Sequence, residues 1–156
     1  MGLYVPNPYV QKNILTCTSG TKTPSATNNY HSLTTNSVTI TPGTWELTGY
    51  ASFSFSGSAL YTDVGVGFYG TNGADTSSAP TTALSGIANL TVDSAVTGNN
   101  TTYLNTASTF AAITIPCVTT WVSCTADSTI YIVTYALMTT AANSRITARM
   151  SVKKIY

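Results

Sequence analysis

The sequence predicts an all-β protein, an antiparallel β-sandwich of jelly-roll type with an extended N-terminal arm. The 156 residues include 31 Thr and 17 Ser, and Thr is a β-branched residue that favours strands and can face water. Apolar and polar side chains alternate through much of the chain, and no amphipathic helix of useful length can be drawn. Roughly eight to ten short strands with Gly/Ser/Thr-rich loops leave a sandwich or a barrel as the simplest architectures.

The N-terminal arm is expected to span residues 1–30, and the sandwich domain residues 31–156. In LYVPNPYV (3–10), Pro6 and Pro8 fix an extended backbone and remove two donors, so this segment cannot be a central strand. Residues 18–29 have the composition of a loop.

The longest strand is expected in TPGTWELTGYASFSFSG, residues 41–57, entered through the turn pair Pro42-Gly43. Its pattern places Trp45, Leu47, Phe53 and Phe55 on the inner face of a sheet, and Thr44, Glu46, Thr48, Ser52 and Ser54 on the outer face. Burial of each large side chain contributes about 1.5–3 kcal/mol. A core strand accounts for the pattern without implying any activity.

Shorter strands are expected at residues 36–41, 63–70, 87–93, 102–106, 110–116 and 117–123. In DVGVGFYG (63–70), Gly65 and Gly67 share a face, which should let a backbone or a bulky ring approach closely. The turn-rich residues 71–86 are expected to be the largest exposed feature of the domain.

The last two strands differ in character. TIYIVTYALM (129–138) is apolar on both faces, as a strand covered on two sides would be. Because a small sandwich usually covers only one face of a sheet, contact between subunits is expected to supply the second cover. SRITARMSVKKIY (144–156) places Arg145, Arg149 and Lys153 opposite its apolar residues.

Four stretches of the chain, in this order, resemble small virion proteins of tailed bacteriophages. They are TPGTWELTGYASF (41–53), DVGVGFYG (63–70), STIYIVTYALM (128–138) and SRITARMSVKKIY (144–156). The order and spacing of the strands carry the resemblance, which leaves out the arm. It implies a trimeric jelly roll similar to tumour-necrosis-factor and complement-head domains, acting either as a capsid cement (decoration) protein or as the receptor-binding tip of a fibre.

Cement is the expected role: a non-enzymatic protein that trimerises and stabilises the head shell. It would be made in the cytoplasm of the bacterial host and act on the capsid surface of the virion. The chain starts at Met1 with room only for a short arm before the domain, which favours cement over a fibre tip.

The expected partners are the major capsid protein and further copies of the chain. The candidate contacts are Tyr4, Val5, Pro6, Pro8 and Tyr9 of the arm and Arg145, Arg149, Lys153 and Lys154 of the basic strand. Extended segments can bind by adding a strand or by lying in proline-shaped grooves. The simpler interpretations are a disordered tail and an edge strand that positive charge protects from aggregation.

As a fibre tip, the domain would instead bind a host-surface carbohydrate. The loops at 71–86 and 94–109 would form the site, with Tyr61, Tyr69, Tyr103 or Trp121 as stacking platforms. That role requires exposed aromatic rings at the distal end of the domain.

Charge and hydropathy argue against other partners. A net charge of +1 is too small for the broad basic face that nucleic-acid binding needs. No apolar run approaches the roughly 18–20 residues of a membrane span, and no secretory signal opens the chain. We therefore expect neither nucleic acid nor a membrane as a partner.

No catalytic, cofactor or metal site is expected. The acidic residues, Glu46, Asp63, Asp75, Asp93 and Asp127, are widely spaced, whereas a glycosidase needs two carboxyl groups about 5–10 Å apart. His31 has no accompanying G-x-S-x-G motif and is expected to be an ordinary polar residue near the arm.

The three cysteines, Cys17, Cys117 and Cys124, are expected to be buried free thiols that act as small hydrophobic residues. A disulfide between Cys117 and Cys124, across a hairpin, is the alternative.

Overall fold

The computed structural model describes residues 14–24, 30–55, 61–93, 102–105, 112–138 and 144–155. Its strands are β1 (Ile14–Thr18), β2 (Tyr30–His31), β3 (Ser37–Ile40), β4 (Gly43–Phe55), β5 (Tyr61–Tyr69), β6 (Leu90–Val92), β7 (Thr102–Asn105), β8 (Ala112–Pro116), β9 (Thr120–Cys124), β10 (Ser128–Met138) and β11 (Ser144–Lys154). Within these ranges, the one helical element is the 3-10 turn η1 (Leu84–Gly86). No helix in them is long and apolar enough to cross a membrane.

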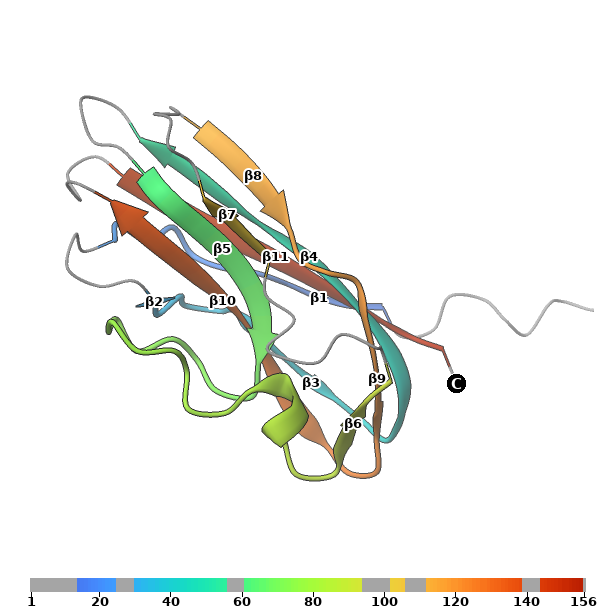
Figure 1. The fold of residues 1–156 in the computed structure, drawn as a ribbon. Helices are drawn as coiled ribbons and strands as arrows, with labels where there is room; N and C mark the ends of the chain where they lie inside the picture. The colour runs from blue at the N-terminus through green and yellow to red at the C-terminus, as the bar shows by residue number, and fades with distance from the viewer. Residues whose placement is uncertain are drawn as a thin grey trace, which may run out of the picture.

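The strands form two antiparallel sheets packed face to face, which confirms the predicted β-sandwich (Figure 1). Sheet A has the order β1-β11-β4-β9-β6, with β8 also paired to β4. Sheet B has the order β2-β10-β5-β7, with β3 also paired to β10.

Strand pairing is nested along the chain. The first described strand, β1, pairs with the last described strand, β11, and β2 and β3 pair with β10. Further inward, β4 pairs with β8 and β9, and β5 pairs with β7. Successive pairs fall in opposite sheets, so the chain is a long hairpin rolled into two layers, which is the jelly-roll connectivity. The short strand β6 is added at the edge of sheet A.

The longest predicted strand is β4, and its inner face is buried as expected. Trp45, Leu47 and Phe53 lie in the core, and the indole Nε1 of Trp45 donates to the Thr41 carbonyl at 2.8 Å. The side chain of Phe55 lies outside the described residues. Gly43 has φ of 139°, a conformation that residues with a side chain rarely adopt, so the entrance to the strand requires glycine.

A β-bulge in sheet B turns one tyrosine into the core. Leu137 of β10 lies opposite Asp63, but Met138 lies opposite Tyr61, so Thr62 is an extra residue in β5. Because such a residue reverses the alternation of side chains, Tyr61 points inward. Its ring meets that of Phe53 edge to face, with 5.7 Å between centroids.

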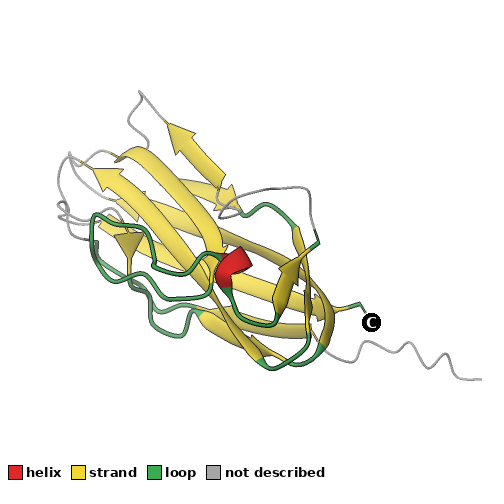
Figure 2. Ribbon diagram, turned by 60° about the horizontal axis from the view of Figure 1, so that its bottom comes forward, coloured by secondary structure: helices red, strands yellow, loops and turns green. Residues whose placement is uncertain are grey.

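The connection after β5 covers part of the outer face of sheet B. β5 and β2 lie on opposite sides of β10, yet the Asn72 side chain, just beyond β5, donates to the Leu33 carbonyl at 3.1 Å, just beyond β2. Residues 70–72 must therefore cross β10 on the side away from sheet A. Figure 2 shows the loop that leads to the helical turn lying in front of the strands. Val133, on that side of β10, is buried within the single chain.

Part of the segment predicted to be an arm belongs to the sandwich. Residues 1–13 lie outside the described residues, but β1 pairs with β11 along its whole length. Lys22 continues the pairing through a bridge to Ile146. Cys17 and Ser19 are buried in consequence. The segment predicted to be an arm, residues 1–30, therefore includes a strand of sheet A. Pairing with β11 satisfies backbone groups that a free arm would leave to water.

Candidate functional site

The predicted basic row lies on the outer face of β11. Arg145, Arg149 and Lys153 are all exposed. Their partners across the ladder in β4 are Ser54, Tyr50 and Glu46. Arg145 donates from Nη1 to the Thr23 hydroxyl at 2.7 Å. None of the ion pairs found among the described residues involves this row, so its charges remain available to a partner.

Lys154, the fourth predicted basic contact, lies on the other side of the strand. Its Nζ is 5.5 Å from the centroid of the Trp45 ring and 3.5 Å from the Thr41 hydroxyl. A cation over an indole face is attracted by the ring quadrupole. Lys154 therefore lies at the end of the core and not with the basic row. The predicted arm contacts Tyr4, Val5, Pro6, Pro8 and Tyr9 lie outside the described residues.

Two of the proposed carbohydrate platforms are wrong. Tyr61 and Tyr69 are each 1% exposed, so neither ring can stack on a sugar. The bulge buries Tyr61, and a bridge between Tyr69 and Ala83 brings the 71–86 connection against Tyr69. Trp121 is 54% exposed, but it lies on the sheet face of β9 and not in a loop. The side chain of Tyr103 lies outside the described residues.

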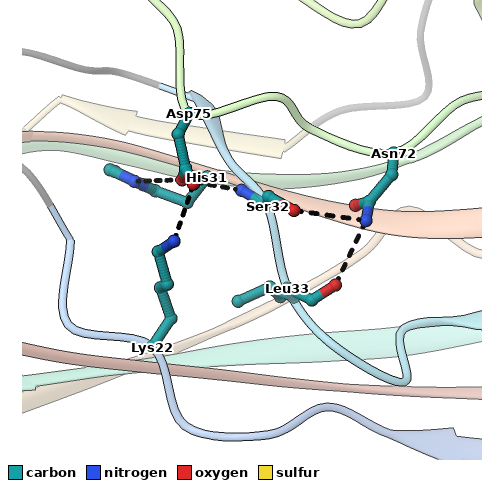
Figure 3. Close-up of polar contacts among 6 residues, drawn as sticks. All are labelled: Lys22, His31, Ser32, Leu33, Asn72 and Asp75. Carbon is teal, nitrogen blue, oxygen red and sulfur yellow. Dashed lines mark hydrogen bonds and ion pairs between the residues drawn. The ribbon is translucent and has the colours of Figure 1, made fainter.

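Asp75 fastens the 71–86 connection to the edge of the sandwich where β2 and the residues after β1 lie (Figure 3). The Asp75 carboxylate accepts a hydrogen bond from Lys22 Nζ at 2.7 Å and one from the Ser32 backbone N–H at 3.0 Å. Lys22 extends the edge of sheet A, and Ser32 follows β2 in sheet B. Asp75 thus bridges both sheets, with a left-handed backbone (φ 52°) that Asp tolerates better than most residues. We call Lys22, His31, Ser32 and Asp75 the Asp75 cluster.

His31 is fully buried in this cluster, whereas an ordinary polar residue was expected. Its Nδ1 lies 3.8 Å from the Asp75 carboxylate, and neither ring nitrogen makes a hydrogen bond of ordinary length and angle. Burial lowers the pKa of His31, although the Ala136 backbone and Asp75 favour the protonated form; Lys22 opposes it. The imidazole is therefore neutral at pH 7, and it cannot serve as a surface acid or base.

The Asp75 carboxyl has its pKa lowered. Partial burial acts to raise the pKa, but the hydrogen bonds from Lys22 and Ser32 and the charges of Lys22 and His31 outweigh it. Among the described residues, no group of three or more His, Cys, Asp or Glu side chains gathers as metal ligands would.

The three cysteines are free and buried, and the alternative disulfide between Cys117 and Cys124 is not formed. Burial raises the pKa of the Cys117 thiol to about 12 and also raises those of Cys17 and Cys124. Because the thiolate is the reactive form, these thiols are inert packing groups.

Two features were not predicted from the sequence. Tyr50 is 41% exposed on the outer face of β4. It occupies an even-numbered position, like the other outward-facing residues of 41–57, so strand parity could have predicted its exposure. Asn36 is buried and donates from Nδ2 to Asn72 Oδ1 at 2.7 Å and to the Ile132 carbonyl at 2.8 Å. No local pattern marks such a long-range pair.

No protein-family model matches the sequence, and no curated protein matches it either. In structure, the chain is weakly similar to chains of infectious bursal disease virus. For the Gx strain the TM-score is 0.31 with 10% identity, over 97% of this chain and 45% of that one. For the VP2 subviral particle the TM-score is 0.27 with 8% identity, over 99% and 46%. The chain thus spans less than half the length of these viral chains, and at such scores the likeness carries no argument about function.

The fold defines a class: a β-sandwich of jelly-roll connectivity in which the connection after β5 covers part of the outer face of sheet B. The Asp75 cluster fastens that connection to both sheets.

Proposed function

We propose that the chain is a structural, non-enzymatic protein of a tailed-bacteriophage virion, a cement protein that forms homotrimers on the head shell and stabilises it. The four stretches that resemble phage virion proteins contain nearly all of β4, β5, β10 and β11. These strands lie side by side within the two sheets, β11 with β4 and β10 with β5. The resemblance thus follows the framework of the fold and not one loop.

The observation that carries the proposal is the exposed basic row of Arg145, Arg149 and Lys153 on a regular sheet face. In a chain with only 7% charged residues, three cations on one strand face are suited to an acidic surface. The major capsid protein would provide that surface, and the N-terminal arm a second contact.

Trimer formation needs a contact between subunits, and the structure leaves less of the expected contact surface exposed. The outer face of β10 was the expected contact, but Val133 there is already covered by the chain itself. Tyr131 and Tyr135 remain half-buried, and Leu137 is 37% exposed. The remaining exposed part of β10 is thus smaller than the sequence suggested.

Deletion of residues 2–12 tests the cement role, because it removes the predicted arm contacts and stops short of β1. We expect the shortened protein to remain folded and trimeric but no longer to co-sediment with head shells. Undiminished shell binding by the shortened protein would count against the arm as a clamp.

A fibre tip that binds a host carbohydrate is the second candidate, and the exposure of Trp121 favours it. Copy number distinguishes the two roles. Quantitative mass spectrometry of purified virions should find hundreds of copies for a cement protein, and at most a few tens for a fibre tip.

A further inference from the structure

We propose that the outer face of sheet A is a docking surface for an acidic protein surface, with Trp121, Tyr50 and Arg149 at its centre. Under the proposed function this partner is the shell protein, and to that extent the inference rests on that function. It adds to the basic row a specific centre and an entire sheet face.

The strand register places these side chains in one patch. Glu46 of β4 lies opposite both Lys153 and Trp121. Four residues further along β4, Tyr50 lies opposite Arg149. At about 3.3 Å per residue, these two cross-strand rows are roughly 13 Å apart on the same face. The aromatic and cationic groups can therefore contact one partner together.

The residue types match those that dominate protein interfaces. Trp121 is 54% exposed, Tyr50 41% and Ile14, in the same row as Lys153, 49%. Trp, Tyr and Arg are the side chains most enriched among binding hot spots. The positions between them carry short hydroxyl side chains: Thr16, Thr48, Ser52, Thr114 and Ser151. Such short side chains make the surface flat and lose little rotamer entropy on contact.

The face is large enough for a stable interface. The six strands of sheet A contain 42 residues in total, and at about 4.8 Å by 3.3 Å per residue they cover roughly 600–700 Å². Standard interfaces bury about 600–1,000 Å² on each partner. A protein surface can cover this area, whereas a single extended glycan strand would leave most of it bare.

Charge selects the occupant. The face carries Arg145, Arg149 and Lys153 against two carboxylates, Glu46 and Asp93, which both lie beside Trp121. The part of the face around Tyr50, Arg149 and Arg145 therefore carries only positive charge. A second copy that met this face across a two-fold axis at its centre would set Arg149 against Arg149. Outside this face the acidic residues are few: Asp75 is bound to Lys22, and Asp63 and Asp127 belong to different parts of the chain. A carboxylate-rich protein matches the cationic part of the face better than a copy of the chain does.

The first experiment measures binding of purified full-length protein to head shells that lack it. We expect Arg149→Glu and Trp121→Thr to weaken binding by about tenfold or more each, as hot-spot substitutions do. Glu46→Gln should tighten it about two- to fivefold by removing one of the two negative charges on the face. The matched controls lie on sheet B: Asp63→Asn makes the same charge change, and Leu137→Thr removes an exposed apolar group. Both should leave binding unchanged.

A second measurement separates this inference from the proposed function. Poly-L-glutamate is titrated into isotope-labelled protein, with amide and indole shifts followed by NMR at two salt concentrations. Salt-sensitive shifts at Tyr50, Trp121 and Arg149 would support an acidic-partner surface even if head shells did not bind and the cement role failed.

Three outcomes would overturn the inference. One is shell binding that Arg149→Glu and Trp121→Thr leave intact, which spares the cement role. Another is the absence of polyglutamate shifts, or shifts confined to sheet B. The last is a fall in oligomeric state in the Trp121→Thr variant, measured by sedimentation, which would make the face a contact between copies.

Discussion

The two outer faces of the sandwich are covered to different extents. On sheet B, the connection after β5 crosses β10, and Tyr69 and Val133 are buried although they point away from the core between the sheets. On sheet A, no described segment crosses the face, and Tyr50 and Trp121 are exposed. Aromatic side chains on outer strand faces can thus be part of the folded core or free for a partner, depending on one loop.

The largest effect expected from this difference comes from a matched pair of tyrosine truncations. Tyr69→Ala on sheet B should cost about 3–5 kcal/mol of unfolding free energy, because it removes a buried aromatic ring. Tyr50→Ala on sheet A should change it by about 0.5 kcal/mol or less, since exposed substitutions are usually near neutral. Urea denaturation of both variants measures the difference. Equal losses would show that the two faces are not distinct in the way described.

A smaller loss of unfolding free energy is expected when Asn36, which links the 71–86 connection to β10, is replaced. Asn36→Ala leaves the Ile132 carbonyl and the Asn72 side chain without the donor that the buried amide supplies. A buried group left unsatisfied costs about 1–3 kcal/mol. Thr39→Ala is the control, because its hydrogen bond to Thr129 is exposed. Binding of a hydrophobic dye should rise only in the Asn36 variant, as the outer face of sheet B opens.

The smallest and most specific test concerns pH. His31 has its pKa lowered from 6.5, so the folded state binds fewer protons than the unfolded state below that pH. Stability from this group is therefore complete above pH 6.5 and is lost as the pH falls through the folded-state pKa. Asp75 also contributes less to stability as the pH falls, but only below pH 3.8, because its pKa is lowered from that value.

The urea concentration at the unfolding midpoint, measured from pH 8 to pH 5, should decrease once the pH is lowered past about 6.5, because His31 becomes protonated in the unfolded state. In His31→Gln, whose side chain does not titrate, the decline over this range should disappear whatever the starting stability. A decline of equal size in both proteins would assign the pH dependence to another group.

Much of the fold could be predicted from the sequence because strand alternation is a local property. The inner face of β4 and the apolar residues of β5 and β11 follow from period two alone. The bounds of β1 were not predicted because the strand lies between the proline-containing segment 3–10 and residues 18–29, which have the composition of a loop. Its pairing partner, β11, lies far away in the sequence.

The surfaces were harder to predict because they depend on contacts distant in sequence. Tyr61 has the outward position by alternation from Asp63, but one extra residue opposite Leu137 and Met138 reverses it. His31 is buried because the 71–86 connection, which carries Asp75, packs beside it. The basic row on β11, by contrast, needed only strand parity, and it was placed correctly.

The nested pairing of strands bears on how the molecule acquires its structure. Because β1 pairs with β11, this edge pair of sheet A cannot close until residues 144–154 have left the ribosome. Ordering so distant a pair is entropically costly and slow, as for other sandwiches with mostly non-local pairing. Until then, the inner faces of β4 and β10 are exposed to other nascent chains, so the rate at which the last strand docks should govern the yield of correctly assembled protein.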